Sequence, residues 1–260
     1  MKAHRSALPT LVAACAAALP LAALAACDVR SSAQTAALIE LYTSEGCSSC
    51  PPADKQLSHL REALDPGAEA VPLSLHVSYW DYIGWKDPYA QTAFKERQRW
   101  LVRANGNKTV YTPQFFIAGS ELRQWRGALG AKVREINAVA AAAGIRIQAS
   151  LNPSGALVLA AEASARAGAR PAALYLALAE NGLASNVTRG ENSGTRLAHD
   201  HVVREWIGPI SLVAGKARIE REIALPATWN PAQLEVVAFV QDEGTGGVLQ
   251  ALRAQQCAKS

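Results

Sequence analysis

Short apolar segments, some continuous and some alternating with polar residues, recur along the chain and predict its strands and helices. In the first half, the expected strands cover residues 36–42, 71–77, 114–118 and 121–125. Amphipathic patterns between and after them predict helices over residues 53–64, 89–104 and 127–143. The order is strand, helix, strand, helix, strand, strand, helix, which we interpret as an α/β domain over residues 36–143.

The periodicity changes beyond Ile145, where short apolar segments follow one another without a convincing helix. These segments predict strands over residues 145–151, 156–163, 172–180, 202–206, 217–225 and 234–241. Strands of this length and spacing are typical of a β-sandwich of roughly seven strands. We therefore expect an all-β, sandwich-like second domain over residues 144–260.

The first 26 residues have the pattern of a secretory signal. Lys2 and Arg5 precede an apolar, alanine-rich run, and polar sequence follows at once. We expect export to the periplasm or the medium, a flexible lead-in over residues 27–35, and no transmembrane span in the mature chain. The 26 Lys and Arg barely exceed the 22 Asp and Glu and form no dense basic run, which argues against a nucleic-acid partner.

The five cysteines fall into three groups: Cys15 in the signal, the closely spaced Cys47 and Cys50, and Cys27 and Cys257 near the two ends. Residues 24–27, Leu-Ala-Ala-Cys, match a bacterial lipobox, in which the cysteine is lipidated and anchors the chain to a membrane. Alternatively, Cys27 pairs with Cys257. The two fates exclude each other because both use the same sulfur atom.

Cys47 and Cys50 lie at the expected turn between the first strand and the first helix. Backbone N–H groups at a helix N-terminus stabilise a thiolate, and the two-residue spacing lets the second thiol reach the first. One interpretation is a redox couple, with Cys47 attacking and Cys50 resolving. The other is a permanent disulfide, although so short a loop constrains the unfolded chain little. Glu45 would oppose thiolate formation if it pointed inward.

The dipeptide Thr112-Pro113 precedes the third expected strand. Together with the Cys-x-x-Cys motif and the order of elements, it resembles the thioredoxin fold. In that fold the corresponding proline is cis and its loop lies beside the cysteines. The resemblance implies that Thr112 and Pro113 align a substrate backbone at Cys47 and Cys50.

Four segments taken together resemble one bacterial family: residues 40–54, 79–88, 111–114 and 189–192. It is the secreted, thioredoxin-like family known as domain of unknown function 1223. The resemblance implies a fold and an exported location. Since the family's activity is not assigned, function has to be inferred from the site itself.

His76 ends the second expected strand, on the cysteine side of the sheet. With Cys47 and Cys50 it offers the thiolate and imidazole ligands that suit copper(I) or zinc. The simpler interpretation is a hydrogen-bonded core histidine. His199 and His201 are two residues apart, and we expect them on a solvated strand face rather than at a metal.

The aromatic loop between the second strand and second helix supplies Trp80, Asp81, Tyr82 and Trp85. These residues can bind an extended peptide or an apolar ligand beside the cysteines, or pack as a lid between the two domains. The polar loop 189–194 is expected as a hairpin with a salt-bridged tip. If the two domains fold over each other, its charged residues would instead cover the cysteines.

Three functions remain. The first is an exported thiol–disulfide oxidoreductase that needs no cofactor, acts through Cys47 and Cys50, and has thiol- or disulfide-containing envelope proteins as partners. The second is a copper(I) or zinc carrier using Cys47, Cys50 and His76. The third is a non-enzymatic binding module of the cell envelope, in which the disulfide is structural.

Overall fold

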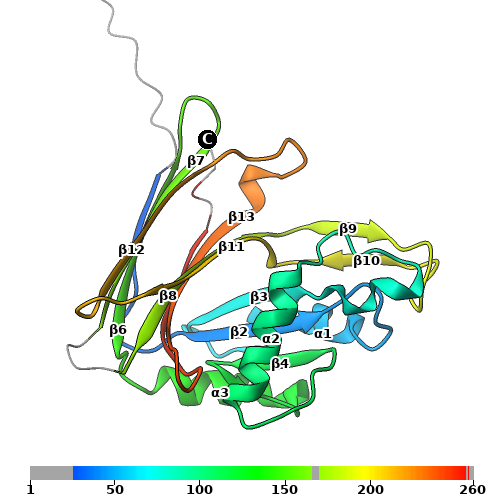
Figure 1. Ribbon diagram of the computed structural model, residues 1–260, viewed down its shortest axis with the longest axis horizontal. Coiled ribbons are helices and arrows are strands. Elements are labelled where there is room, and N and C mark those ends of the chain that lie inside the picture. Colours follow the sequence, from blue (N-terminus) through cyan, green and yellow to red (C-terminus); the bar gives the residue numbers. More distant parts are fainter. Residues whose placement is uncertain (1–25, 166–169, 256, 258–260) are drawn as a thin grey trace, which may run out of the picture.

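The computed structural model describes residues 26–165, 170–255 and 257, and these form two main sheets flanked by helices (Figure 1). The expected signal segment, apart from Ala26, lies outside the described residues. None of the helices in the described part of the chain is long and apolar enough to cross a membrane.

The larger sheet has eight strands in the order β14-β13-β8-β11-β3-β2-β4-β5. Its strands are β2 (Ala37–Thr43), β3 (Ala70–His76), β4 (Gln114–Ile117), β5 (Ser120–Glu121), β8 (Ala172–Glu180), β11 (Val202–Ser211), β13 (Leu234–Asp242) and β14 (Val248–Gln255). All residues of β2, β8 and β13 are buried, because other layers cover both faces of these strands.

The second sheet has the order β1-β6-β7-β12. It consists of β1 (Ala26–Arg30), β6 (Ala143–Leu151), β7 (Leu157–Ala165) and β12 (Lys216–Ile223). Buried residues alternate with more exposed ones along β6 and β7, so one face packs on the core and the other meets solvent. A separate hairpin pairs β9 (Leu183–Asn186) with β10 (Arg196–His199).

Three α-helices and three short 3-10 helices complete the described fold. They are α1 (Pro51–Ser58), α2 (Thr92–Ala104), α3 (Trp125–Asn137), η1 (Leu60–Ala63), η2 (Ser78–Ile83) and η3 (Pro231–Gln233). Side chains of α2 pack on one face of the large sheet. On the opposite face, α1 and α3 cover β2 and β4, and the four-stranded sheet covers β8 and β13.

The expected fold class, a thioredoxin-like α/β domain followed by a β-sandwich-like domain, is wrong. Strand β11 comes from the second half of the chain, yet it pairs in parallel with β3, where Val202 lies opposite Ser74, and antiparallel with β8. Strands from both halves therefore form one mixed sheet, which crosses the expected boundary between residues 143 and 144. The hydrophobic pattern locates strands, but it does not say which strands pair.

Several elements also differ from the expected ranges. Residues 26–30, expected at the end of the signal and in a flexible lead-in, form β1 and pair with β6. Helix α1 ends at Ser58 and α3 at Asn137, both earlier than expected. Strand β14 was not expected, and β9 and β10 correspond to the hairpin expected around residues 189–194, for which no strand ranges were predicted.

A buried ion pair joins the two halves within the core. Arg97 on α2 donates from Nε to Oε1 of Glu40 on β2 at 2.5 Å and from Nη2 to Gln241 on β13 at 3.1 Å. Its guanidinium also lies 4.6 Å from the Trp206 ring centroid and 5.0 Å from that of Phe239. The charge is thus enclosed by residues from three strands, β2, β11 and β13.

The ends of the described chain are joined covalently. Cys27 on β1 and Cys257, just after β14, form a disulfide with their Cα atoms 5.1 Å apart. The bridge closes a loop of 230 residues in sequence. Of the two fates considered for Cys27, the structure contains the disulfide.

Candidate functional site

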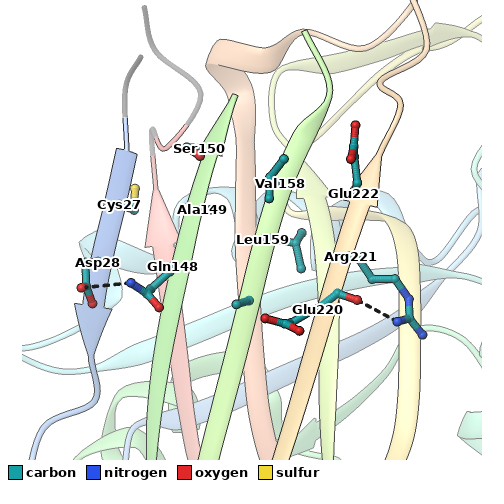
Figure 2. A pocket seen from close by; sticks show the side chains of 11 residues that line it. Cys27, Asp28, Gln148, Ala149, Ser150, Val158, Leu159, Glu220, Arg221 and Glu222 are labelled. Carbon is teal, nitrogen blue, oxygen red and sulfur yellow. Dashed lines mark hydrogen bonds between the residues drawn. The ribbon is translucent and has the colours of Figure 1, made fainter. Parts of the chain in front are cut away.

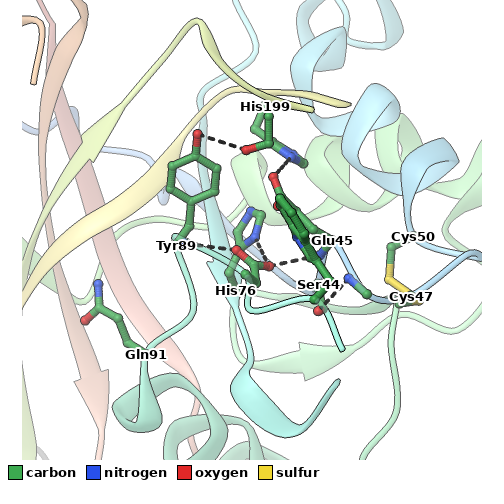
Figure 3. A network of polar contacts seen from close by, with 12 residues as sticks. Ser44, Glu45, Cys47, Cys50, His76, Tyr89, Gln91 and His199 are labelled. Carbon is green, nitrogen blue, oxygen red and sulfur yellow. Dashed lines mark hydrogen bonds and ion pairs between the residues drawn. A yellow bond between two sulfur atoms is a disulfide. The ribbon is translucent and has the colours of Figure 1, made fainter. Parts of the chain in front are cut away.

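Cys47 and Cys50 form a disulfide in the turn between β2 and α1, with Cα atoms 5.4 Å apart (Figure 3). Cys50 is the N-cap residue of α1, and its carbonyl oxygen accepts the backbone N–H groups of Ala53 and Asp54. Proline at the first helical positions has a preset φ and needs no N–H partner, so the helix begins at Pro51. Only 2% of Cys47 and none of Cys50 is exposed.

The Thr112–Pro113 peptide bond is cis, and its loop lies beside the disulfide. The Thr112 carbonyl oxygen is 3.7 Å from Cys47 Sγ. Trp80 of the aromatic loop donates from Nε1 to Thr112 Oγ1 at 2.8 Å. The structure therefore brings together Cys47, Thr112 and Trp80, three residues that the sequence singled out.

Glu45 points inward, and its fully buried carboxylate accepts two hydrogen bonds from distant parts of the chain. Trp85 Nε1 donates to Oε2 at 2.7 Å, and Oε1 lies 3.1 Å from His199 Nε2. The backbone N–H of Glu45 donates to Asp87 Oδ2 at 2.9 Å. These contacts satisfy the carboxylate that sequence analysis regarded only as an obstacle to a thiolate.

His76 ends β3 and is completely buried. Its Nδ1 lies 2.8 Å from Asp87 Oδ2. Burial alone would lower the pKa of His76, but the charge and hydrogen bond of Asp87 raise it above its ordinary value. Burial likewise opposes ionisation of Asp87, yet the charge of His76 leaves the pKa of this carboxyl lowered.

The His76 and His199 rings meet edge to face with centroids 4.9 Å apart and an interplanar angle of 85°, and Tyr89 packs against both. Asp54, in the first turn of α1, is also buried. Burial raises its pKa, although the charges of His199 and His76 act in the opposite direction. We call Thr43, Glu45, Asp54, His76, Asp87 and His199 the buried polar cluster.

Four side-chain atoms of this cluster have no hydrogen-bond partner among the described residues: Thr43 Oγ1, Asp54 Oδ1, His76 Nε2 and His199 Nδ1. No other buried side-chain nitrogen or oxygen in the described residues shares this property. Unpartnered buried polar atoms are costly and rare in folded proteins. Because all four unpartnered atoms lie in this one cluster, it differs from the rest of the described core.

The loop between β9 and β10, residues 187–195, lies over the cysteine turn, and we call it the cap loop. The Asn192 side chain donates from Nδ2 to the carbonyl oxygens of Glu45 and Cys47 at 2.8 and 3.1 Å. The Ser48 backbone N–H donates to Glu191 Oε2 at 2.9 Å. Hydrogen bonding from Ser48, first through its side chain and then through its backbone, lowers the pKa of Glu191. The loop thus forms a hairpin and also covers the cysteines, the two possibilities that the sequence left open.

A family model described as "Protein of unknown function (DUF1223)" matches residues 38–241. The chain belongs to this family. The matched range contains the cysteine pair, the aromatic loop, the Thr112–Pro113 bond and the cap loop. No curated protein matches the chain.

Two solved structures resemble this DUF1223 chain. A crystal structure of an Agrobacterium tumefaciens protein is 21% identical, with a TM-score of 0.63, and the match covers 87% of this chain and 96% of that one. HBP35 of Porphyromonas gingivalis is 17% identical, with a TM-score of 0.65, covering 86% of this chain and 76% of that one. At these identities the likeness concerns the fold alone.

Most of the aromatic loop of the DUF1223 chain wraps the site instead of facing solvent. The indole N–H groups of Trp80 and Trp85 donate hydrogen bonds to Thr112 and Glu45, respectively. Asp81 Oδ1 accepts the backbone N–H of Asp87 at 3.3 Å. Tyr82 is 81% exposed, whereas Trp80, Asp81 and Trp85 are partly buried. Among the four residues expected to bind a substrate, Tyr82 alone is free to meet a partner without rearrangement.

The sequence analysis missed the roles of Asp54, Asn192 and His199. The expectation that His199 and His201 share a solvated strand face is wrong. His199 ends β10 and is 2% exposed, whereas His201 lies outside that strand at φ 58° and pairs with Glu235 at 2.9 Å. The signal was the alternation in Arg-Leu-Ala-His, because Leu197 and His199 fall on the same buried face of β10.

The copper or zinc alternative required Cys47, Cys50 and His76 to converge. In the described part of the chain, no group of three or more His, Cys, Asp or Glu side chains is arranged to hold a metal ion. His76 is instead engaged with Asp87, and both sulfur atoms are in the disulfide.

A separate hollow of about 620 Å³ lies on the four-stranded sheet (Figure 2). Its lining comes from β1, β6, β7 and β12 and includes Asp28, Gln148, Val158 and Glu220. None of the residues of the buried polar cluster or the cysteine turn lines it. The hollow therefore does not belong to the candidate site.

Proposed function

We propose that Cys47 and Cys50 form a thiol–disulfide exchange centre. One observation carries the proposal: five buried ionisable side chains, those of Glu45, Asp54, His76, Asp87 and His199, surround a four-residue disulfide turn. Burying such groups is expensive, and a disulfide that only stapled the turn would need none of them. Ionisable groups with perturbed pKa values gather at sites that carry out chemistry.

Exchange would begin when a thiolate of a dithiol partner attacks Cys47 Sγ. The bond between Cys47 and Cys50 breaks, a mixed disulfide forms on Cys47, and Cys50 leaves as a thiolate that takes a proton. The partner's second thiolate then attacks its own sulfur in the mixed disulfide and releases Cys47. The partner leaves oxidised, and two electrons remain on the two cysteines. The reverse sequence oxidises the protein and reduces a partner.

Cys47 suits the role of the attacked sulfur because it lies on the side of the Thr112–Pro113 loop, where an extended partner segment would align. Cys50 is the deeper residue and is continuous with α1. The proposed partners are thiol- or disulfide-containing proteins of the cell envelope. Since both sulfur atoms are covered, such a partner gains access only when the cap loop moves.

The proposed location is outside the cytoplasm, either periplasmic or secreted. The signal-like first 26 residues support it, and so does the disulfide between Cys27 and Cys257, since such bridges persist in oxidising compartments. With its sulfur in this bridge, Cys27 has no thiol left for a lipid. We therefore propose a bridged mature protein in place of a lipid-anchored one.

Trapping tests the proposal directly. In Cys50→Ala, the mixed disulfide on Cys47 cannot be resolved, so covalent adducts with envelope proteins should accumulate and disappear on addition of a reductant. Cys47→Ala/Cys50→Ala is the matched control and should give no adduct. A reduction potential within about −270 to −120 mV fits an exchange centre, whereas one below about −300 mV fits a structural bridge. Absence of both adducts and insulin reduction would overturn the proposal.

A further inference from the structure

The two buried histidines near the disulfide, His76 and His199, contact carboxylates in the same way. Each ring has one nitrogen on a carboxylate, His76 Nδ1 on Asp87 and His199 Nε2 on Glu45. The other nitrogen of each ring has no partner among the described residues. Since an imidazole takes up or gives a proton near neutral pH, both free nitrogens are positions where a proton can be held.

Asp54 connects this pair of rings with the cysteines. It follows Cys50 by four residues on α1, and residues with that spacing lie on one helix face with Cβ atoms about 5–6 Å apart. Strand β10, which carries His199, packs against α1. Asp54, whose Oδ1 is unpartnered, thus lies one helical turn after Cys50, and the charges of His199 and His76 act on its carboxyl.

The cluster contains more carboxyls than imidazoles, which favours a proton on one of the carboxyls. Three carboxyls, those of Glu45, Asp54 and Asp87, face two imidazoles, so full ionisation of all five groups leaves one negative charge. Burial raises the pKa of Asp54, while the pKa of Asp87 is lowered by its histidine. Of these two acids, Asp54 is thus the one that more readily carries a proton.

The surrounding ionisable groups do not replace Asp54 in this balance. Tyr89 packs on both rings, and burial raises the pKa of its hydroxyl. Arg204 on β11 lies over the Tyr89 ring at 5.5 Å, but its charge is paired with Glu180 at 2.6 Å. Asp81, with Lys86 nearby, contacts the cluster only through the Asp87 backbone.

We propose that Asp54, His76 and His199 form a proton store for the Cys47–Cys50 pair. When the disulfide is opened, Cys50 leaves as a thiolate and takes the proton of the Asp54 carboxyl. The new carboxylate is then stabilised by the neighbouring His76 and His199 side chains. On oxidation, the Cys50 thiol returns its proton to Asp54 before its sulfur attacks. The store serves a cysteine that has no exposed surface of its own.

This inference rests on the proposed exchange function, and its test separates the two. The full-length mature protein is reduced by dithiothreitol over about pH 5–9, and the rate is compared between the unchanged protein, Asp54→Asn and the surface control Asp65→Asn. We expect Asp54→Asn to lower the rate at neutral pH about 10-fold. After correction for the thiolate fraction of dithiothreitol, the variant should also lose the fall in rate with rising pH that deprotonation of Asp54 causes. The control should match the unchanged protein.

A second measurement needs no variant. Proton NMR titration of His76 and His199 in the oxidised and reduced protein should show at least a tenfold difference in proton affinity between the two states for one or both rings. Identical titrations in both states, together with an unchanged profile in Asp54→Asn, would overturn the proton store. If the unchanged protein exchanges with no thiol at any pH, the proposed function itself fails.

Discussion

The side-chain amide of Asn192 donates a hydrogen bond to the backbone oxygen of Cys47, 145 residues earlier in the sequence. A second bond from the same nitrogen reaches the oxygen of Glu45. One residue of the cap loop thereby holds the turn that contains the disulfide and limits access to it.

Removing this amide should make the disulfide easier to reach. In Asn192→Ala two hydrogen bonds are lost, each worth about 1 kcal/mol, so the open form of the cap loop becomes more populated. We expect reduction by dithiothreitol to be about 10-fold faster. Asn152→Ala, in a distant turn where the side chain bonds to Glu222, is the matched control. Equal rates for both variants would show that the cap loop does not limit access.

Acid should destabilise the protein through Glu235. Burial tends to raise the pKa of this carboxyl, but the hydrogen bond and charge of His201, with help from Arg253, bring it down from 4.5 to about 2. Because the folded-state pKa lies below the unfolded-state value, the contribution is complete above about pH 5 and is lost as the pH falls towards 2. A shift of this size corresponds to about 3 kcal/mol of unfolding free energy.

Urea unfolding at a series of acidic pH values measures this contribution. Glu235→Gln should show a shallower loss of unfolding free energy between about pH 5 and 2 than the unchanged protein. Glu96→Gln, which removes an exposed carboxylate paired with Arg99, should follow the unchanged curve. A Glu235→Gln curve parallel to that of the unchanged protein would contradict the prediction.

Removing one partner of the buried ion pair between Arg97 and Glu40 should destabilise the fold, because the other charge would then be buried without a counter-charge. Arg97→Met leaves a buried carboxylate without its counter-charge, which costs about 3–5 kcal/mol of unfolding free energy. The double variant Arg97→Met/Glu40→Gln should recover much of this loss. Arg99→Met, at an exposed pair, should cost less than about 1 kcal/mol. A double variant as unstable as Arg97→Met would refute this account.

The bridge between Cys27 and Cys257 should stabilise the fold strongly, because it closes a 230-residue loop. Long loops gain most from closure, and Cys27→Ser/Cys257→Ser should lose about 2–5 kcal/mol of unfolding free energy. Intact mass of the exported protein under non-reducing conditions should show two disulfides and no lipid. A lipid mass on Cys27 would exclude the bridge.

Individual strands could be predicted from the sequence because their signal is local. Residues 172–179 form a continuous apolar run, and β8 covers this run together with Glu180. The sheet could not be predicted, since β11 reaches β3 through the single opposed pair Val202 and Ser74, and no periodicity encodes a partner so distant in sequence.

The candidate site was predictable to the same extent. Cys47, Cys50 and Thr112 belong to short motifs, so their proximity followed from a resemblance. His199 belongs to no such motif, and the segment 189–192 that ends at Asn192 supported the family resemblance without indicating a contact with Cys47. Both residues reach the site because the β9–β10 hairpin lies against α1. The sequence therefore indicated the site residues that belong to short motifs, but not those that long-range packing brings to them.

The mixed sheet also imposes an order in time. A ribosome makes Cys47 and Cys50 before Asn192 and His199, so during synthesis the pair exists for a time without the cap loop and without His199. Likewise, the edge of β3 opposite β2 has no pairing strand until β11 has been made. The period in which the cysteines of this protein are most open to other thiols is therefore its own folding.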